Sequence, residues 1–180
     1  MIYNLIRKNI NSIASEKIYT MGISITLNNT LVETRLKAMG LTLPTTSEPG
    51  GNYVSVNVRA NIAYVAIQFP ILNGEFFYQG KLGEELNTND GSAAMQICAV
   101  NVLSQIKSKI GFENILGLNH IDVYYTSANA WDDAPIVADA ASNLFLNILG
   151  EEGKHSRALI GAAHLPRNFC VGLSTSFTLC

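Results

Sequence analysis

The segment His155-Ser156-Arg157 is the strongest local candidate for chemistry in this sequence. It follows the end of a predicted helix and leads into a predicted strand. An arginine at such a junction can present its planar guanidinium to a carboxylate and donate two charge-assisted hydrogen bonds. The alternative is a surface ion pair between Arg157 and Glu151 or Glu152. Either way, Arg157 is the first residue to consider for binding an anionic group.

Two further pairs could carry chemistry, and each has a structural alternative. His120 and Asp122 are two positions apart in a predicted strand, so they could form a dyad on one face or lie on an exposed strand face. Asp132 and Asp133 could act as paired acids, or could cap a helix at the end where its dipole favours negative charge. The sequence has no P-loop, GxGxxG, HExxH or GxSxG motif.

The low charge content of the sequence indicates which kinds of binding partner to expect. Only 14% of the 180 residues are charged, against roughly 25% in ordinary domains. This predicts either surface hidden in an oligomer or a neutral polar surface. The net charge is -2, and no basic cluster is denser than Arg7-Lys8, so we expect no nucleic-acid partner. No apolar run reaches the roughly 18 residues of a membrane span, so we expect no membrane partner either.

The cysteine count points to a reducing compartment. The three residues Cys98, Cys170 and Cys180 form no CxxC pair, which disfavours a disulfide framework or a zinc site. We therefore predict a cytoplasmic protein with no cofactor and no metal. Cys98 falls on the apolar face of a predicted helix, where it is expected to be a small core residue.

The N-terminal residues differ from the rest. We predict an extension of unclear role over residues 1–25 and a single folded domain over residues 26–180. The extension combines Ile6, Ile10 and Ile13 at helical spacing with several basic residues, so organelle targeting is the alternative.

Helical periodicity and capping signals predict three helices. The first begins with a capping box of Thr30 and Glu33 and ends at Gly40. The second begins near Thr88-Asn89-Asp90 and ends at Gly111. The third begins at Asp132 or Asp133, with Pro135 in its first turn, and ends at Gly150.

Strand patterns separate these helices. Val54, Val56 and Val58 alternate with polar residues, and Asn73-Gly74 marks a hairpin. The element order predicts an α+β two-layer sandwich, with a mixed sheet and two main helices on one face. Small residues on the second face of the last strand favour packing of that face in an oligomer. The other strands are expected at 62–69, 118–126, 157–165 and 170–179.

Several segments together resemble the RidA/YjgF family, also called endoribonuclease L-PSP. Their order and spacing, rather than any one motif, carry the resemblance, which spans roughly residue 30 to the C-terminus. The resemblance is closest to the branch of the family that has a capped helix before this domain core. The matching segments are Leu36 to Pro44, Gly51 to Val56, Tyr64 to Pro70, Ala93 to Ile110, Ser156-Arg157-Ala158, Leu165-Pro166 and Val171-Gly172-Leu173.

This resemblance implies a chorismate-mutase-like fold that assembles as a homotrimer with clefts between subunits. Well-characterised members hydrolyse enamines and imines such as 2-aminoacrylate to 2-keto acids and ammonia. By this resemblance, Arg157 would bind the substrate carboxylate and Tyr53 would line the pocket.

The same comparison marks departures from the family pattern. Ile67 replaces a glycine, Asp139 stands at a pocket asparagine, Leu159 replaces a small residue, and Gly172 replaces the glutamate that positions water, with Ser174 where a second glutamate is usual. Two hypotheses follow. The chain is either an imine deaminase that uses Arg157 or a trimeric protein that binds a small acid without converting it, with RNA cleavage a distant third.

Overall fold

A computed structural model describes residues 27–180, and the predicted extension over residues 1–25, with its targeting alternative, lies outside the described residues. Five strands form the main sheet in the order β1-β2-β7-β5-β6. β5 and β6 are parallel and the other neighbours are antiparallel, which confirms the predicted mixed sheet. The strands are β1 (Val56–Arg59), β2 (Ile62–Gln68), β5 (Ile115–Tyr125), β6 (Ser156–Gly161) and β7 (Val171–Leu179).

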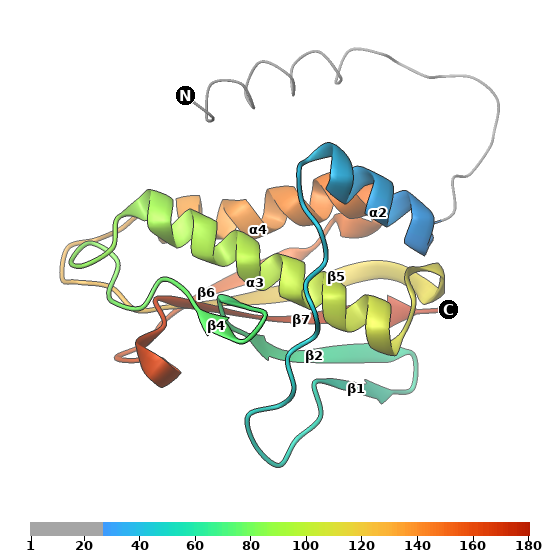
Figure 1. The fold of residues 1–180 in the computed structure, drawn as a ribbon, viewed down its shortest axis with the longest axis horizontal. Helices are drawn as coiled ribbons and strands as arrows, with labels where there is room; N and C mark the ends of the chain where they lie inside the picture. The colour runs from blue at the N-terminus through green and yellow to red at the C-terminus, as the bar shows by residue number, and fades with distance from the viewer. Residues whose placement is uncertain (1–26) are drawn as a thin grey trace.

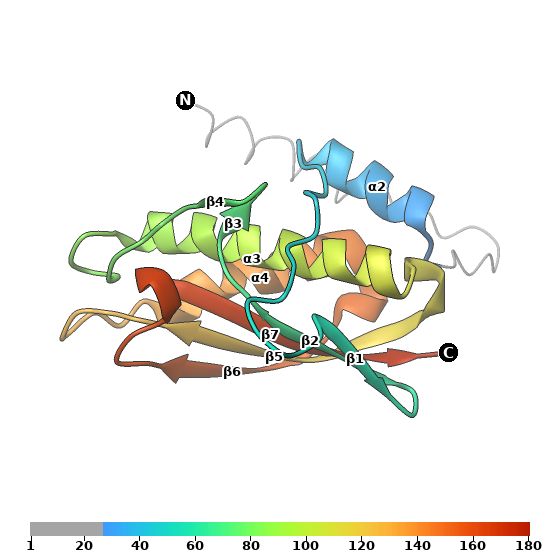
Figure 2. The same cartoon turned by 60° about the horizontal axis from the view of Figure 1, so that its bottom comes forward.

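Two long helices cover one face of this sheet (Figures 1 and 2). α3 (Thr88–Lys109) and α4 (Ala134–Leu149) pack on each other, and α3 also packs on β2 and β7. The apolar stripe predicted for α3 is buried, including Cys98 with no exposed surface. α4 contributes Phe145, whose complete burial is worth on the order of 1.5–3 kcal/mol. The α+β layered fold is therefore confirmed.

Shorter elements complete the fold. α2 (Asn29–Ala38) packs against α4, and the segment after it crosses α3 toward β1 (Figure 1). Ser104 and Gln105 of α3 donate hydrogen bonds to backbone carbonyls of this segment at 2.6 and 2.9 Å. No helix among residues 27–180 is long and apolar enough to cross a membrane. The 3-10 turns are η1 (Phe112–Asn114), η2 (Gly150–Gly153) and η3 (Pro166–Asn168).

The helix starts differ slightly from the prediction. The cap of α2 is Asn28, whose side chain accepts a hydrogen bond from the Leu31 amide at 2.9 Å, so the predicted capping box of Thr30 and Glu33 is wrong. An asparagine is at least as good a cap as a threonine, and here it comes two residues earlier. α3 is likewise capped one residue early, by Asn87.

The hairpin predicted at Asn73-Gly74 is present. It joins β3 (Ile71–Leu72) to β4 (Glu75–Phe76), and both turn residues have positive φ, as a tight two-residue turn requires. The buried Asn101 side chain donates to the carbonyls of Phe69 and Ile71 at 3.0 and 2.8 Å. α3 thereby fixes the point where β2 passes into the hairpin.

The first strand is shorter and more exposed than the sequence indicates. The alternation over Val54, Val56 and Val58 predicts a half-buried strand, but β1 begins at Val56, and Val54 is 61% exposed. β1 is the edge of the sheet, so α3 covers it only in part. Local alternation carries no information about whether a strand is central or at an edge.

Within residues 27–180, no helix lies over the second face of the sheet (Figure 2). The register places Tyr64, Ser176 and His120 side by side on this face, and Tyr124 beside Gly172. Tyr64 is 52% exposed. A sheet face that meets water is normally rich in charged residues, and this one displays mainly small or uncharged side chains.

Candidate carboxylate-binding site

Arg157 lies on β6, paired in register with the buried Ile121, so its side chain is on the helix-covered side. Its Nη1 donates to Asp139 Oδ1 at 2.6 Å and to Ser142 Oγ at 3.3 Å. Both acceptors come from α4, one turn apart. The alternative ion pair with Glu151 or Glu152 does not form, because the ion pair of Arg157 is with Asp139, and Glu151 pairs with Lys154.

The hydrogen bonds of Arg157 are distributed unevenly. Nη1 carries two N–H groups, and Asp139 and Ser142 together use both. Within the part of the chain that the structure describes, Nε and Nη2 have no hydrogen-bond partner, and the side chain is 28% exposed. This leaves the Nε–Nη2 edge, which has the spacing for two parallel hydrogen bonds to a carboxylate. Asp139, a predicted pocket residue, contacts Arg157 directly, and its part in ligand binding stays a prediction.

Ser142, which was not predicted, joins the site together with His155 of the candidate segment His155-Ser156-Arg157. His155 Nε2 is 3.0 Å from Ser142 Oγ, and His155 Nδ1 is 2.6 Å from the carbonyl oxygen of Gly153. The His155 ring also meets the Phe145 ring edge-on, with centroids 6.1 Å apart. A signal was available in the sequence, because Asp139 and Ser142 share a helix face at i,i+3 spacing.

The other predicted pocket residues divide into two groups. Leu159 is two positions after Arg157 on β6 and is 38% exposed, so it lies next to the arginine. Tyr53 precedes β1, and Ile67 and Gly172 belong to β2 and β7. β1 and β6 are the opposite edges of the sheet, so a single chain does not bring Tyr53 to Arg157.

The space above Gly172, where the family has a glutamate, is filled by the side chains of Ile67 and Phe69. A Cβ at Gly172 would lie 2.8 Å from Ile67 Cδ1 and 2.9 Å from Phe69 Cε1. β2 is irregular between Val65 and Gln68, and this bulge turns Ile67 toward β7. No larger side chain fits at position 172 unless Ile67 moves, so these two replacements are structurally coupled.

The predicted His120–Asp122 pair forms on the open face. His120 Nε2 is 3.2 Å from Asp122 Oδ1, and its Nδ1 is 2.8 Å from Ser156 Oγ. Ser174 donates to the second oxygen of Asp122 at 3.1 Å. These groups satisfy one another across β5, β6 and β7, on the side of the sheet away from Arg157.

Asp133, one of the two acids predicted before α4, has a structural role. Asp133 is at the helix start, and its Oδ2 accepts a hydrogen bond from Thr88 Oγ1 at 2.6 Å. This contact joins the N-termini of α3 and α4. Asp133 is the N-cap residue by position, but its side chain makes no capping hydrogen bond to the first turn of α4.

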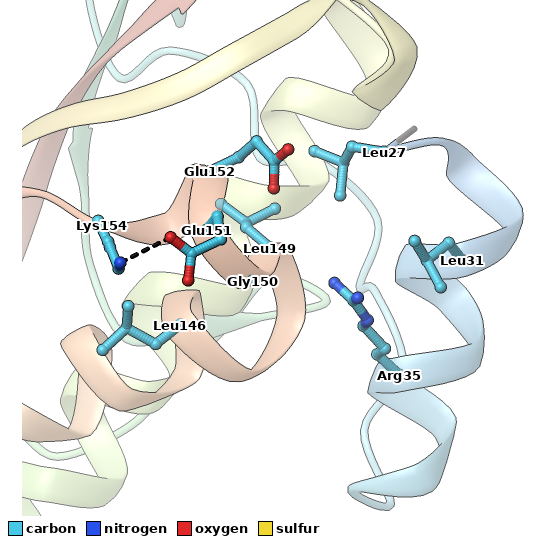
Figure 3. Close-up of a pocket in the computed structure, with 9 residues that line it drawn as sticks. All are labelled: Leu27, Leu31, Arg35, Leu146, Leu149, Gly150, Glu151, Glu152 and Lys154. Carbon is cyan, nitrogen blue, oxygen red and sulfur yellow. Dashed lines mark hydrogen bonds and ion pairs between the residues drawn. The ribbon is translucent and has the colours of Figure 1, made fainter. Parts of the chain in front are cut away.

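A hollow of about 530 Å³ lies between α2 and the C-terminal end of α4, away from Arg157 (Figure 3). Leucines form its apolar wall. Its arginine, Arg35, donates to the Ile148 carbonyl at 2.7 Å and so caps the end of α4. The lining residues are Leu27, Leu31, Arg35, Leu146, Leu149, Gly150, Glu151, Glu152 and Lys154.

Comparison with known families agrees with this fold. Residues 33–177 match the model of the family described as "YjgF/chorismate mutase-like, putative endoribonuclease". The match covers most of the chain, and the chain belongs to this family. The predicted family resemblance is therefore confirmed.

Individual relatives show the same relationship. The chain is 32% identical to Protein TCP17 of Trypanosoma cruzi over 137 residues, which is 75% of this chain and 86% of that protein. The crystal structure of Atu1372 from Agrobacterium tumefaciens, titled as a protein of unknown function, is 31% identical, with a TM-score of 0.79 over 84% of this chain and 94% of that one. A "putative endoribonuclease" from Shewanella oneidensis is 30% identical, with a TM-score of 0.80 over 82% and 99%.

Proposed function

We propose that this protein binds a small carboxylate at Arg157, in a pocket completed by a second subunit of a homotrimer. The observation that carries the proposal is the guanidinium itself. α4 holds its Nη1 through Asp139 and Ser142, and the Nε–Nη2 edge has no partner among the described residues. An arginine held in this way has already lost much of the freedom that ligand binding would otherwise cost.

The two sheet edges support a second subunit in the pocket. Leu159 and Ile160 are partly exposed at the β6 edge, and Tyr53 and Val54 are more than half exposed before β1 at the other edge. Contact between two different surfaces of identical chains is heterologous, and it closes into a ring when the rotation permits. Such a contact would bring Tyr53 of one subunit toward Arg157 of its neighbour. The number three comes from the family resemblance.

Hydrolysis of an imine at this site is the second candidate. Asp139 supports it, because a carboxylate beside the guanidinium can hold a water molecule next to a bound acid. Ile67 over Gly172 favours binding without conversion, because it occupies the position of the family's water-positioning glutamate. Release of 2-keto acid from freshly generated 2-aminoacrylate distinguishes the two functions.

The binding proposal is tested with pyruvate, the simplest 2-keto acid, by calorimetry or ligand-observed NMR. We expect saturable binding by the wild type, none by Arg157→Ala, and weaker binding by Tyr53→Ala. Lys37→Ala, which removes an exposed cation of α2, is the control and should bind as the wild type does. Equal binding by the wild type and Arg157→Ala would refute the proposal.

A further inference from the structure

We infer that His155 and Ser142 are positioning residues for Arg157, joined in a hydrogen-bond relay that starts at the backbone of η2. This inference rests on the proposed function, because it assigns how the carboxylate-binding group is held. It concerns two residues that lie thirteen positions apart, on α4 and just before β6. Neither belongs to the family pattern on which Arg157 was predicted.

The direction of the relay follows from its first contact. His155 Nδ1 is 2.6 Å from the Gly153 carbonyl oxygen. A carbonyl cannot donate, so the proton in this contact is on Nδ1. In the neutral imidazole, Nε2 is then the acceptor, and the contact at 3.0 Å is a hydrogen bond donated by Ser142 Oγ.

The second contact completes the relay. With its hydrogen directed to His155, Ser142 Oγ presents lone pairs to Arg157 Nη1 at 3.3 Å. Without His155, this hydroxyl could instead rotate its hydrogen toward the guanidinium or toward a helix carbonyl. His155 therefore sets the hydroxyl orientation that accepts from Arg157, and Asp139 takes the other N–H of the same nitrogen.

The start of the relay is rigid. Gly153 is buried, and a Cβ there would overlap the carbonyl of Phe145, so η2 packs directly on the backbone of α4. Phe145 also contacts the His155 ring edge-on. The imidazole is thus held by a backbone carbonyl, a hydroxyl and an aromatic ring.

Two substitutions of His155 separate the relay from simple packing. His155→Gln places an amide oxygen near the position of Nε2 and keeps an acceptor for Ser142. His155→Asn keeps a donor near the position of Nδ1 for Gly153 and loses that acceptor. Because one neutral hydrogen bond is at stake, we expect Ser142→Ala and His155→Asn to weaken pyruvate binding about two- to tenfold, and His155→Gln to bind within about twofold of the wild type.

Nitrogen NMR of the full-length protein gives two readouts that need no ligand. The His155 ring should show a protonated Nδ1 and an unprotonated Nε2. Rotation of the Arg157 guanidinium about its Cζ–N bonds should become faster in Ser142→Ala and His155→Asn but not in His155→Gln. If both histidine variants bind pyruvate equally, the inference is wrong.

The inference and the proposed function fail in different ways. If the wild type does not bind pyruvate, the proposed function fails for this ligand class, and the relay is judged on guanidinium rotation alone. Faster rotation in the variants that break the relay then supports it, and unchanged rotation overturns it. If the nitrogen NMR signals of His155 in the Arg157→Ala variant equal those of the wild type, the relay from Gly153 to Ser142 forms independently of the arginine.

Discussion

At the scale of single residues, the main feature is Arg157, whose guanidinium nitrogens have different surroundings. The Nη1 end of Arg157 is bound to Asp139 and Ser142, and the Nε–Nη2 edge has no hydrogen-bond partner among residues 27–180. Asp139 has opposing effects here. It orients the guanidinium, but its negative charge also repels an incoming carboxylate.

The charge of Asp139 can be separated from its geometry. Asp139→Asn retains an oxygen that accepts from Nη1 and removes the negative charge. A partly exposed pair of this kind is worth up to about 1 kcal/mol, so we expect pyruvate affinity to rise by up to about fivefold. Asp132→Asn, an exposed acid before α4, is the control. A large loss of affinity in Asp139→Asn would mean that its charge is needed to hold Arg157.

The cysteines give a prediction about pH. Burial raises the pKa of Cys98 well above its ordinary value and raises the pKa of Cys170 to about 12. Both thiols are therefore protonated at neutral pH, and only the exposed Cys180 should react quickly with a thiol reagent. All three should react after unfolding, and rapid labelling of more than one in the native protein would contradict this.

The same two thiols link stability to alkaline pH. In the unfolded chain they would lose protons near pH 9, whereas Cys170 in the folded chain keeps its proton until about pH 12. Above pH 9 the folded state therefore binds more protons, so the free energy of unfolding should fall as pH rises from 9 toward 12. Cys170→Ala should show a shallower fall, measured by denaturant unfolding at each pH.

Residue-level inference from the sequence worked where a side chain belongs to a recognisable pattern. Arg157 contacts Asp139, and Leu159 is two positions after Arg157 on β6, while their assignment to a ligand pocket stays a prediction. Ser142 was missed because a serine within a helix carries no motif. Its partner His155 reaches it only because η2 folds the chain back onto α4, which is a tertiary contact that local spacing does not encode.

At the scale of elements, η2 is the turn that positions His155 beside α4. This single turn connects α4 to β6, and its last residue, Gly153, supplies the carbonyl that holds His155. The C-terminal end of α4 is supported from the other side by Arg35 of α2. The elements that position Arg157 are therefore fixed by contacts with one another.

Gly153→Ala should disturb both stability and binding. The added methyl group would overlap the Phe145 carbonyl, so η2 must move away from α4. We expect a loss of about 1–3 kcal/mol in the free energy of unfolding, together with weaker pyruvate binding. Gly117→Ala on β5 is a matched control, because a Cβ there would lie at an ordinary 3.7 Å from the Glu152 carbonyl oxygen. Equal stability of the two variants would contradict the packing argument.

The order of the elements could be predicted from the sequence, but the residues at which the edge strands begin and end could not. Helical periodicity and glycine stops located α3 and α4 closely, because a buried stripe and a terminal glycine are local signals. β1 was predicted too long, and β6 was expected over 157–165 but spans Ser156–Gly161. Both are edge strands, whose lengths depend on pairing with only one neighbour.

At the scale of the whole molecule, the predicted pocket residues are spread across one sheet, with Ile67 and Gly172 on the interior strands β2 and β7 and most of the others at its two edges. Arg157 and Leu159 are on β6, and Tyr53 lies just before β1. Edge strands leave backbone groups unpaired, and here apolar side chains are exposed beside both edges. In the ring that we propose, Tyr53 of one chain would lie near Arg157 and Leu159 of the next, while Ile67 and Gly172 stay on interior strands.

The most direct test of this account is complementation between two defective chains. Arg157→Ala and Tyr53→Ala variants are coexpressed in equal amounts, and pyruvate sites with the wild-type Kd are counted. If each pocket takes Arg157 from one subunit and Tyr53 from the next, each mixed trimer has one intact pocket, which is about a quarter of all pockets after random assembly, so sites absent from either variant alone should reappear. If mixed oligomers form and no such site appears, the pocket does not lie between these two edges, and the account is wrong.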